Sequence, residues 1–316
     1  MKHTRLYYAA TFSLLAASIT ACGSNDTLMA QEPENAGNLA AMADSDASAS
    51  TETENSGFTG ASSTEGYEII FEDDFVNDTG IPDPDKWSLC KKGDAHWAEY
   101  QSESYDLAYT KDGLLNLVVE QKDGQYLTSG IETMKKFSFT YGKVEVRARF
   151  TKRAMGSHCG IWMMPEPPAE TWPKSGEIDI MEYLREQDFV HLTTHSYWLN
   201  DMGHAADGVS YTTASMDKDN WNIYGVEWTA DSIRYTVNGK VVLTYSRDQN
   251  LSGEDAAYQW PFTHPFYLIL SHSLGGDGTW AGPIDNSQLP GLFQIDWVRV
   301  MQPAAADAGV PRIPAD

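Results

Sequence analysis

The chain has 316 residues and a formal net charge of −23, with 45 Asp and Glu against 22 Lys and Arg. This acidic balance repels polyanions, so it excludes a general nucleic-acid-binding function and favours neutral ligands. Ten Trp and sixteen Tyr supply more aromatic surface than a core alone needs. We therefore expect one good-sized globular domain, acting as a monomer.

Residues 1–22 read as an export signal. Lys2 and Arg5 precede an apolar run that ends near Ile19 and is too short to span a membrane. The ending ITAC resembles a bacterial lipobox, in which Cys22 would be lipidated and become the first mature residue; an ordinary cleaved signal is the alternative. The sequence thus predicts an exported bacterial protein at the outer membrane or cell surface, which contacts the membrane only through this lipid anchor.

Residues 23–66 carry Ala, Ser, Thr, Asn, Asp and Glu and scarcely any large apolar residue, so we expect a disordered acidic linker. Residues 67–303 form the expected catalytic domain, and residues 304–316 a flexible tail. The domain holds two cysteines, Cys90 and Cys159, which the sequence leaves open as a disulfide or as two buried thiols.

Short segments rich in β-branched and aromatic residues fill the domain, with no long helical pattern between them. Val144, Val146, Ala148 and Phe150 alternate with charged residues, as in a half-buried antiparallel strand. Turn pairs such as Asn238-Gly239 separate the segments. The pattern predicts an all-β antiparallel sandwich. Its expected strands are YEIIFEDDF, LLNLVVEQ, YGKVEVRARF, CGIWMM, EIDIMEYL, VHLTTHSYW, WNIYGVEWT, SIRYTVNGKVVLTY (a hairpin), FYLILSHSL and FQIDWVRVM.

The segment GEIDIMEYL carries three acids at an uneven spacing. In a regular strand Glu177 and Asp179 share one face, whereas Glu182 falls on the other. A β-bulge between Asp179 and Glu182 would bring all three to one face, and bulges are frequent beside active sites. We therefore predict a bulged strand whose acids line a substrate cleft.

Two carboxylates about 5–5.5 Å apart support retaining glycoside hydrolysis. Asp179, lying between the glutamates, would hold their pKa values apart and favour a protonated Glu182 beside an ionised Glu177. A catalytic zinc site is the competing interpretation, but the strand has no clear histidine partner. No cofactor is required for the hydrolytic chemistry.

Aromatic residues gather on the segments around the acidic strand, and aromatic faces stack on the apolar faces of sugar rings. His195 is expected to bond either Asp179 or a substrate hydroxyl, with a structural histidine as the alternative. The predicted substrate-binding residues are Trp97, Tyr100, Trp162, Trp172, His195 and Trp198.

GEIDIMEY resembles the catalytic motif of glycoside hydrolase family 16, in its bulged form. The resemblance extends from about Phe71 to Val300 and includes FEDDF, YGKVEVRARF, GIWMMP, HLTTHSYW and FQIDWVRV. It implies a concanavalin-like jelly roll with a concave cleft, and endo-acting, retaining cleavage. It also implies Glu177 as nucleophile, Glu182 as acid/base and Asp179 as assistant.

WPKSGEIDIMEY is most similar to the laminarinase-like branch, which implies a β-1,3-glucan or mixed-linkage glucan as substrate. Two positions depart from that branch: Ala98 stands where a substrate-binding Asn is expected, and SHCG replaces the usual Trp-Pro before WMMP. Because both changes alter the substrate site, agar-type galactans and mucin-type O-glycans remain alternative substrates. A glycan-binding, lectin-like lipoprotein without activity is the alternative of another class.

The resemblance also implies a possible structural calcium ion on the convex face. Its ligands would be Asp74 and Asp296, whose carboxylate oxygens suit that ion.

Overall fold

The computed structural model describes residues 66–77, 79–184 and 187–304. Cys22, the export signal, the linker up to residue 65 and the tail from residue 305 lie outside these ranges, so the predictions for them are not tested. Within the ranges, no helix has the length and apolar character that crossing a membrane requires.

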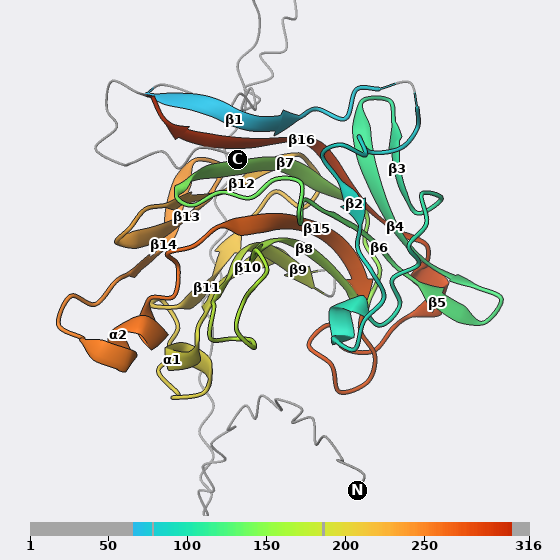
Figure 1. Ribbon diagram of the computed structural model, residues 1–316. Helices are drawn as coiled ribbons and strands as arrows, with labels where there is room; N and C mark the ends of the chain where they lie inside the picture. The colour runs from blue at the N-terminus through green and yellow to red at the C-terminus, as the bar shows by residue number, and fades with distance from the viewer. Residues whose placement is uncertain (1–65, 78, 185–186, 305–316) are drawn as a thin grey trace, which may run out of the picture. The chain divides into compact units, whose positions relative to one another are not determined.

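Two antiparallel sheets form a sandwich (Figure 1). One has nine strands in the order β14-β13-β12-β7-β16-β4-β3, with β1 beside β16 and β5 beside β4, and the other has seven in the order β11-β10-β9-β8-β15-β6-β2. This arrangement confirms the predicted all-β, jelly-roll fold. The strands are β1 (Tyr67–Asp73), β2 (Ser88–Leu89), β3 (Ala108–Lys111), β4 (Leu114–Lys122), β5 (Gln125–Leu127), β6 (Ser129–Glu132), β7 (Gly142–Lys152), β8 (Ser157–Pro165), β9 (Glu177–Leu184), β10 (Phe189–His195), β11 (Tyr211–Ser215), β12 (Asn222–Trp228), β13 (Ser232–Val237), β14 (Lys240–Ser246), β15 (Phe266–Leu274) and β16 (Gly291–Pro303).

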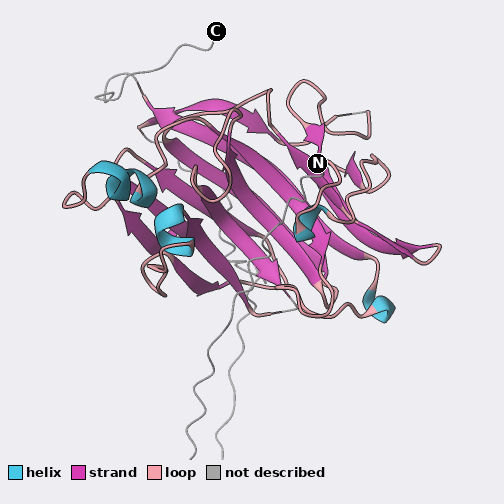
Figure 2. Cartoon of the chain, turned by 60° about the horizontal axis from the view of Figure 1, so that its bottom comes forward, coloured by secondary structure: helices cyan, strands magenta, loops and turns pink. Residues whose placement is uncertain are grey.

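The helical segments are short, and Figure 2 shows them beside the long strands. They are the 3-10 turns η1 (His96–Ala98) and η2 (Asn286–Gln288) and the α-helices α1 (Tyr197–Asn200) and α2 (Gly253–Gln259). The predicted strand VHLTTHSYW ends at His195, earlier than expected, because the Ser196 hydroxyl accepts from the backbone N–H of Leu199 and starts α1.

The main hydrophobic core lies between the two sheets. Val144, Val146 and Ala148 of β7 are fully buried in it, as the alternation predicts, and Ile161 and Ile178 reach it from the other sheet. Burial of such apolar faces on both sheets is the dominant favourable contribution to the stability of a sandwich.

The two ends of the folded domain lie side by side. In the antiparallel pair of β1 and β16, Tyr67 is opposite Pro303. The pairing continues one step outward, since the Ala304 N–H donates to the Gly66 carbonyl over 2.9 Å. The sheet therefore includes residues at both predicted domain boundaries.

The hairpin predicted at Asn238-Gly239 is confirmed. These residues join β13 to β14 with φ angles of 51° and 76°, the left-handed pair that a two-residue type I′ turn requires. Asn and Gly tolerate this conformation better than other residues do.

Candidate active site

A β-bulge in β9 places the three acids on one face. β8 pairs Ile161 with Met181 and Trp162 with Asp179, so Ile180 is the extra residue, and β10 shows the same shift between His191 and Thr193. Ile178, Ile180, Met181 and Tyr183 all point into the main core. The side chains of Glu177, Asp179 and Glu182 lie on the outer face of the sheet, which confirms the predicted bulge.

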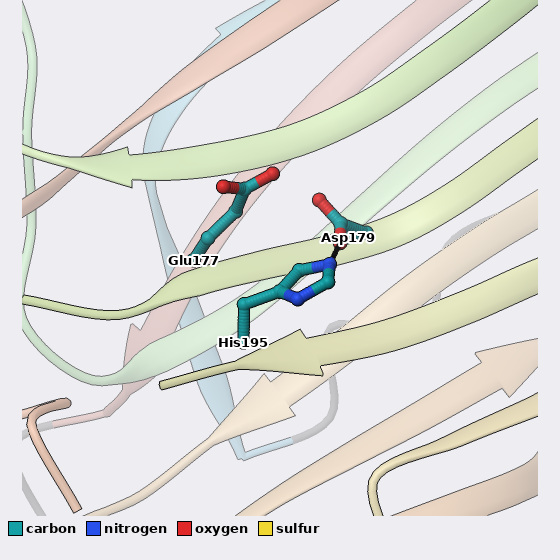
Figure 3. Close-up of side chains that lie close together, drawn as sticks. All are labelled: Glu177, Asp179 and His195. Carbon is teal, nitrogen blue, oxygen red and sulfur yellow. Dashed lines mark ion pairs between the residues drawn. The ribbon is translucent and has the colours of Figure 1, made fainter. Parts of the chain in front are cut away.

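Asp179 is buried and forms an ion pair with His195 of β10. The His195 Nε2 lies 3.1 Å from Asp179 Oδ2, and Figure 3 shows the ring against this carboxylate, with Glu177 on the same strand as Asp179. Nδ1 of the ring lies 2.9 Å from Nδ2 and 3.3 Å from Oδ1 of Asn200 in α1, so the Asn200 amide holds the other side of the ring. Of the alternatives left open for His195, the bond to Asp179 is therefore the one observed.

The pair formed by Asp179 and His195 holds a proton tightly. Burial opposes a charge on His195, but the hydrogen bond and charge of Asp179, with the two glutamates, raise its pKa to about 10. Burial, Glu177 and Glu182 likewise raise the pKa of Asp179 well above its usual value. A proton shared between these two groups lowers the repulsion among three crowded carboxylates.

Glu182 is paired with a different histidine. His158 of β8 places Nε2 at 3.0 Å from Glu182 Oε1. Burial opposes the negative charge on Glu182, but the hydrogen bond and charge of His158, with the charges of His195 and His191, hold its pKa below the usual value. The sequence predicts the opposite, a Glu182 that favours its protonated form, because it does not reveal the contact between His158 and Glu182.

Glu177 lies beside an exposed indole. Trp172 Nε1 donates to Glu177 Oε2 over 2.5 Å, and the Trp172 ring centroid lies 5.8 Å from that of His195. Trp172 is 43% exposed. It is therefore both tied to the acidic strand and available to a sugar ring, as its predicted role requires.

Two of the predicted aromatic residues pack on each other. Trp162 of β8 lies opposite Asp179, is only 8% exposed and donates its indole N–H to the Ser271 hydroxyl. Trp97 in η1 meets the Trp162 ring edge to face at 4.9 Å. Trp162 is thus a buried residue beside Asp179, and Trp97 is the more exposed of the two indole rings.

The structure places Tyr100 and Trp198 against other rings. Tyr100 makes an edge contact of 5.6 Å with Tyr126. Trp198 in α1 stacks on His204 with centroids 3.8 Å apart and also packs against the main core. Their roles in substrate binding stay predictions.

Sequence reasoning missed three residues near the acids, His158, His191 and Trp280. His191 lies opposite Glu182 on β10, and its ring centroid is 5.0 Å from that of Trp280, an exposed residue of the loop after β15. The even spacing of His158 and Trp162, four residues apart on one strand, is the signal that could have placed His158 on the same face.

The site contains the histidine that the zinc interpretation lacked. Glu177, Asp179 and His195 each offer a ligand atom, all within 4.8 Å of one another. The ion pair of Asp179 with His195 occupies the Nε2 that a metal would need, so metal binding there would have to displace its proton.

The calcium ligands predicted on the other face have partners within the protein. Asp296 pairs with Arg147, and an Asp74 carboxylate oxygen accepts from the backbone N–H of Val76 over 3.3 Å. A calcium ion at Asp74 and Asp296 would have to share Asp296 with this arginine, and it stays a prediction.

Cys90 and Cys159 are free and buried, so they do not form the disulfide that the sequence left open. Burial raises the pKa of both thiols well above the usual value. We therefore expect both to be unreactive and to act as small apolar side chains.

Residues 94–299 match the protein family described as Glycosyl hydrolases family 16. This chain belongs to glycoside hydrolase family 16. A keratan-sulfate endo-1,4-beta-galactosidase of Sphingobacterium multivorum is 38% identical over 245 residues, covering 75% of this chain and 56% of that protein. The family 16 chain thus spans little more than half the length of this relative.

Two further comparisons point to different sugars. A beta-glucanase of Rhodothermus marinus is 30% identical over 248 residues, covering 74% of this chain and 85% of that protein. A solved structure from work on endo-acting O-glycanases, by which human gut bacteria initiate mucin breakdown, aligns with a TM-score of 0.66 and 32% identity. This alignment covers 74% of the family 16 chain and 98% of that chain.

We expect Trp172→Ala and Trp162→Ala to differ in their effects on activity and on stability. Trp172→Ala should lower kcat/KM by a factor that corresponds to about 1–3 kcal/mol. The melting temperature should hardly change, because the ring is 43% exposed. Trp162→Ala should lower the melting temperature as well, since it removes a buried ring. Kinetics and thermal melts of both variants measure this. Equal losses of stability for the two would contradict the assignment.

Proposed function

We propose that the protein is a retaining endo-β-glycosidase, with Glu177 as nucleophile and Glu182 as acid/base. The observation that carries this proposal is the bulge at Ile180, which brings both glutamates and Asp179 to one face. Each glutamate also has its own neighbour, Trp172 for Glu177 and His158 for Glu182. Two carboxyl groups with different surroundings are what the two roles demand.

In the first step, the Glu177 carboxylate attacks the anomeric carbon while Glu182 protonates the leaving oxygen. The bond to the aglycone breaks and a glycosyl ester forms. The Trp172 indole N–H, bonded to one Glu177 oxygen, fixes the orientation of the nucleophile. In the second step, Glu182 takes a proton from water as the water oxygen attacks the anomeric carbon. The ester bond to Glu177 breaks, which restores its carboxylate and releases the sugar with its original anomeric configuration.

Asp179 assists without touching the anomeric carbon. It is buried between the glutamates and shares a proton with His195. If Asp179 were fully ionised and unpaired, its charge would raise the pKa of both glutamates and hinder the ionised nucleophile. The pairing of Asp179 with His195 therefore keeps the centre of the cluster close to neutral.

A non-catalytic, lectin-like function is the alternative of another class. Binding of a neutral glycan gives no reason to hold three adjacent carboxylates, because they repel one another and each loses hydration. The relatives named as an endo-galactosidase and a glucanase also support an enzyme.

The order of bond formation predicts the product. If Glu177 forms a glycosyl ester, β-configured product must appear first, as proton NMR during the first turnovers can show. Glu177→Ala should abolish hydrolysis, and azide filling the vacated space should give an α-glycosyl azide. Glu170→Ala, which removes an exposed carboxylate seven residues earlier, should remain active as the matched control. Early release of the α anomer would disprove the retaining mechanism.

The substrate is proposed as a β-linked neutral backbone, either a β-1,3-glucan or a galactose-containing chain of the keratan or mucin O-glycan kind. Similarity to the Rhodothermus marinus beta-glucanase supports the first. The higher identity to the keratan-sulfate endo-galactosidase supports the second. His158 stands in the segment where the laminarinase-like branch has Trp-Pro, which also favours a sugar other than glucose.

Incubation with laminarin, mixed-linkage glucan, agarose, keratan sulfate and mucin O-glycans should decide between these substrates. An endo-acting enzyme releases oligosaccharides of several lengths from one class, and mass spectrometry identifies them. We expect products from the glucans or from the galactose-containing chains. Binding of any of them without products would favour the lectin instead.

We also propose that Cys22 is acylated and anchors the exported protein to a bacterial membrane. The basic start, apolar run and ITAC sequence support this proposal. The protein should then partition with membranes and carry a lipid mass increment on its first mature residue, and Cys22→Ser should abolish both. Soluble, unmodified wild-type protein would contradict the anchor.

A further inference from the structure

Glu182 and His158 form a largely enclosed pair. His158 Nε2 and Glu182 Oε1 are 3.0 Å apart, and the two side chains are 18% and 17% exposed. Little water can therefore replace either partner, so the hydrogen bond has more effect than a similar one at an open surface. The proposed reaction assigns no part to His158.

The register of β8 and β9 explains why these residues meet. Gly160 lies directly opposite Glu182. A Cβ atom on Gly160 would lie 3.0 Å from both Ser271 and the Trp162 ring, so only glycine fits there without displacing them. The side chain of β8 that reaches Glu182 is therefore that of His158, two residues earlier on the same face.

The other histidines near Glu182 and His158 are not the hydrogen-bond partner of Glu182 Oε1. His191 lies opposite Glu182 on β10, but its Nε2 lies 3.1 Å from the Gln187 side-chain oxygen. His195 is paired with Asp179. Burial lowers the pKa of His272 on β15 to about 4, which leaves this neighbour of His158 uncharged at neutral pH.

We propose that His158 is a positioning residue that sets the acid strength of Glu182 by donating Nε2–H to Oε1. The proposal rests on the acid/base role proposed for Glu182. With Oε1 occupied, Oε2 carries the proton that moves to the glycosidic oxygen when the bond to the aglycone breaks. The carboxylate that remains is stabilised by His158. In the second step the proton from water returns to Oε2, so His158 itself neither gains nor loses a proton.

Loss of this hydrogen bond makes Glu182 a weaker acid. In His158→Leu, burial is opposed only by the charges of His195 and His191, so the alkaline limb of the kcat/KM profile should move up by about one to two pH units. His158→Gln keeps a neutral N–H donor and should give a smaller shift. His96→Gln changes a histidine side chain that is 80% exposed and should leave the profile unchanged.

The dependence on the leaving group separates this role from a structural one. Suitable probes are the phenyl and 2,4-dinitrophenyl β-glycosides of laminaribiose and of N-acetylglucosaminyl-β-1,3-galactose. Phenyl glycosides need a proton on the departing oxygen, whereas dinitrophenyl glycosides do not. Compared on the plateau below the alkaline limb, where Glu182 is protonated in both proteins, His158→Leu should therefore lose about tenfold in kcat/KM with the phenyl glycoside and little with the dinitrophenyl glycoside. Thermal melts show whether each His158 variant is folded, and His158→Gln carries the test if His158→Leu is unfolded.

Glu182→Ala is the reference variant, because it removes the acid itself and should show the same selectivity more strongly. If Glu182→Ala slows both glycosides equally, the acid/base assignment is wrong and the role of His158 fails with it. If Glu182→Ala is selective but the His158 variants lose equally with both glycosides, with an unmoved alkaline limb, only the role of His158 is overturned.

Discussion

The site depends on one extra residue in β9. Ile180 and Met181 are neighbours in sequence, yet both lie in the main core, and this is possible only because the strand is bulged there. Without the bulge, alternation would turn Glu182 toward the core. Burial of an unpaired carboxylate costs several kcal/mol, so the apolar face and the acidic face of β9 favour the same local geometry. The requirements of folding and of the site therefore coincide at this residue.

The neighbouring strands supply the charges that the acids need. β8 contributes His158 to Glu182, and β10 contributes His195 to Asp179. Both partners are imidazoles, which can hydrogen-bond a carboxylate with or without a full positive charge, whereas arginine always carries its charge. Among the described residues, arginine pairs such as that of Arg147 with Asp296 lie on the nine-stranded sheet, away from β9. The two histidines thus offset the negative charge of the cluster, one through Asp179 and the other through Glu182.

Much of the fold could be predicted because its signals are local. The alternation of β7, the parity of the acids in β9 and the Asn238-Gly239 turn all lie within a few residues, and the structure confirms each. The short strands β2, β3, β5, β6 and β11 were not predicted, because two to five residues give too little alternation to recognise. The early end of β10 was missed for a similar reason, since a single capping hydroxyl at Ser196 decides it.

The contacts around the acids could not be predicted in the same way, because they depend on strand register. Nothing within SHCG shows that Gly160 lies opposite Glu182 and that His158 therefore reaches it. The distinction between Trp162 and Trp172 is also non-local: one is covered by η1, and the other lies in the loop that ends beside Glu177. A motif of three acids can thus identify a reaction from sequence. The surroundings of each acid, by contrast, depend on which side chains the flanking strands and loops bring against that motif, and these come from segments far apart in the sequence.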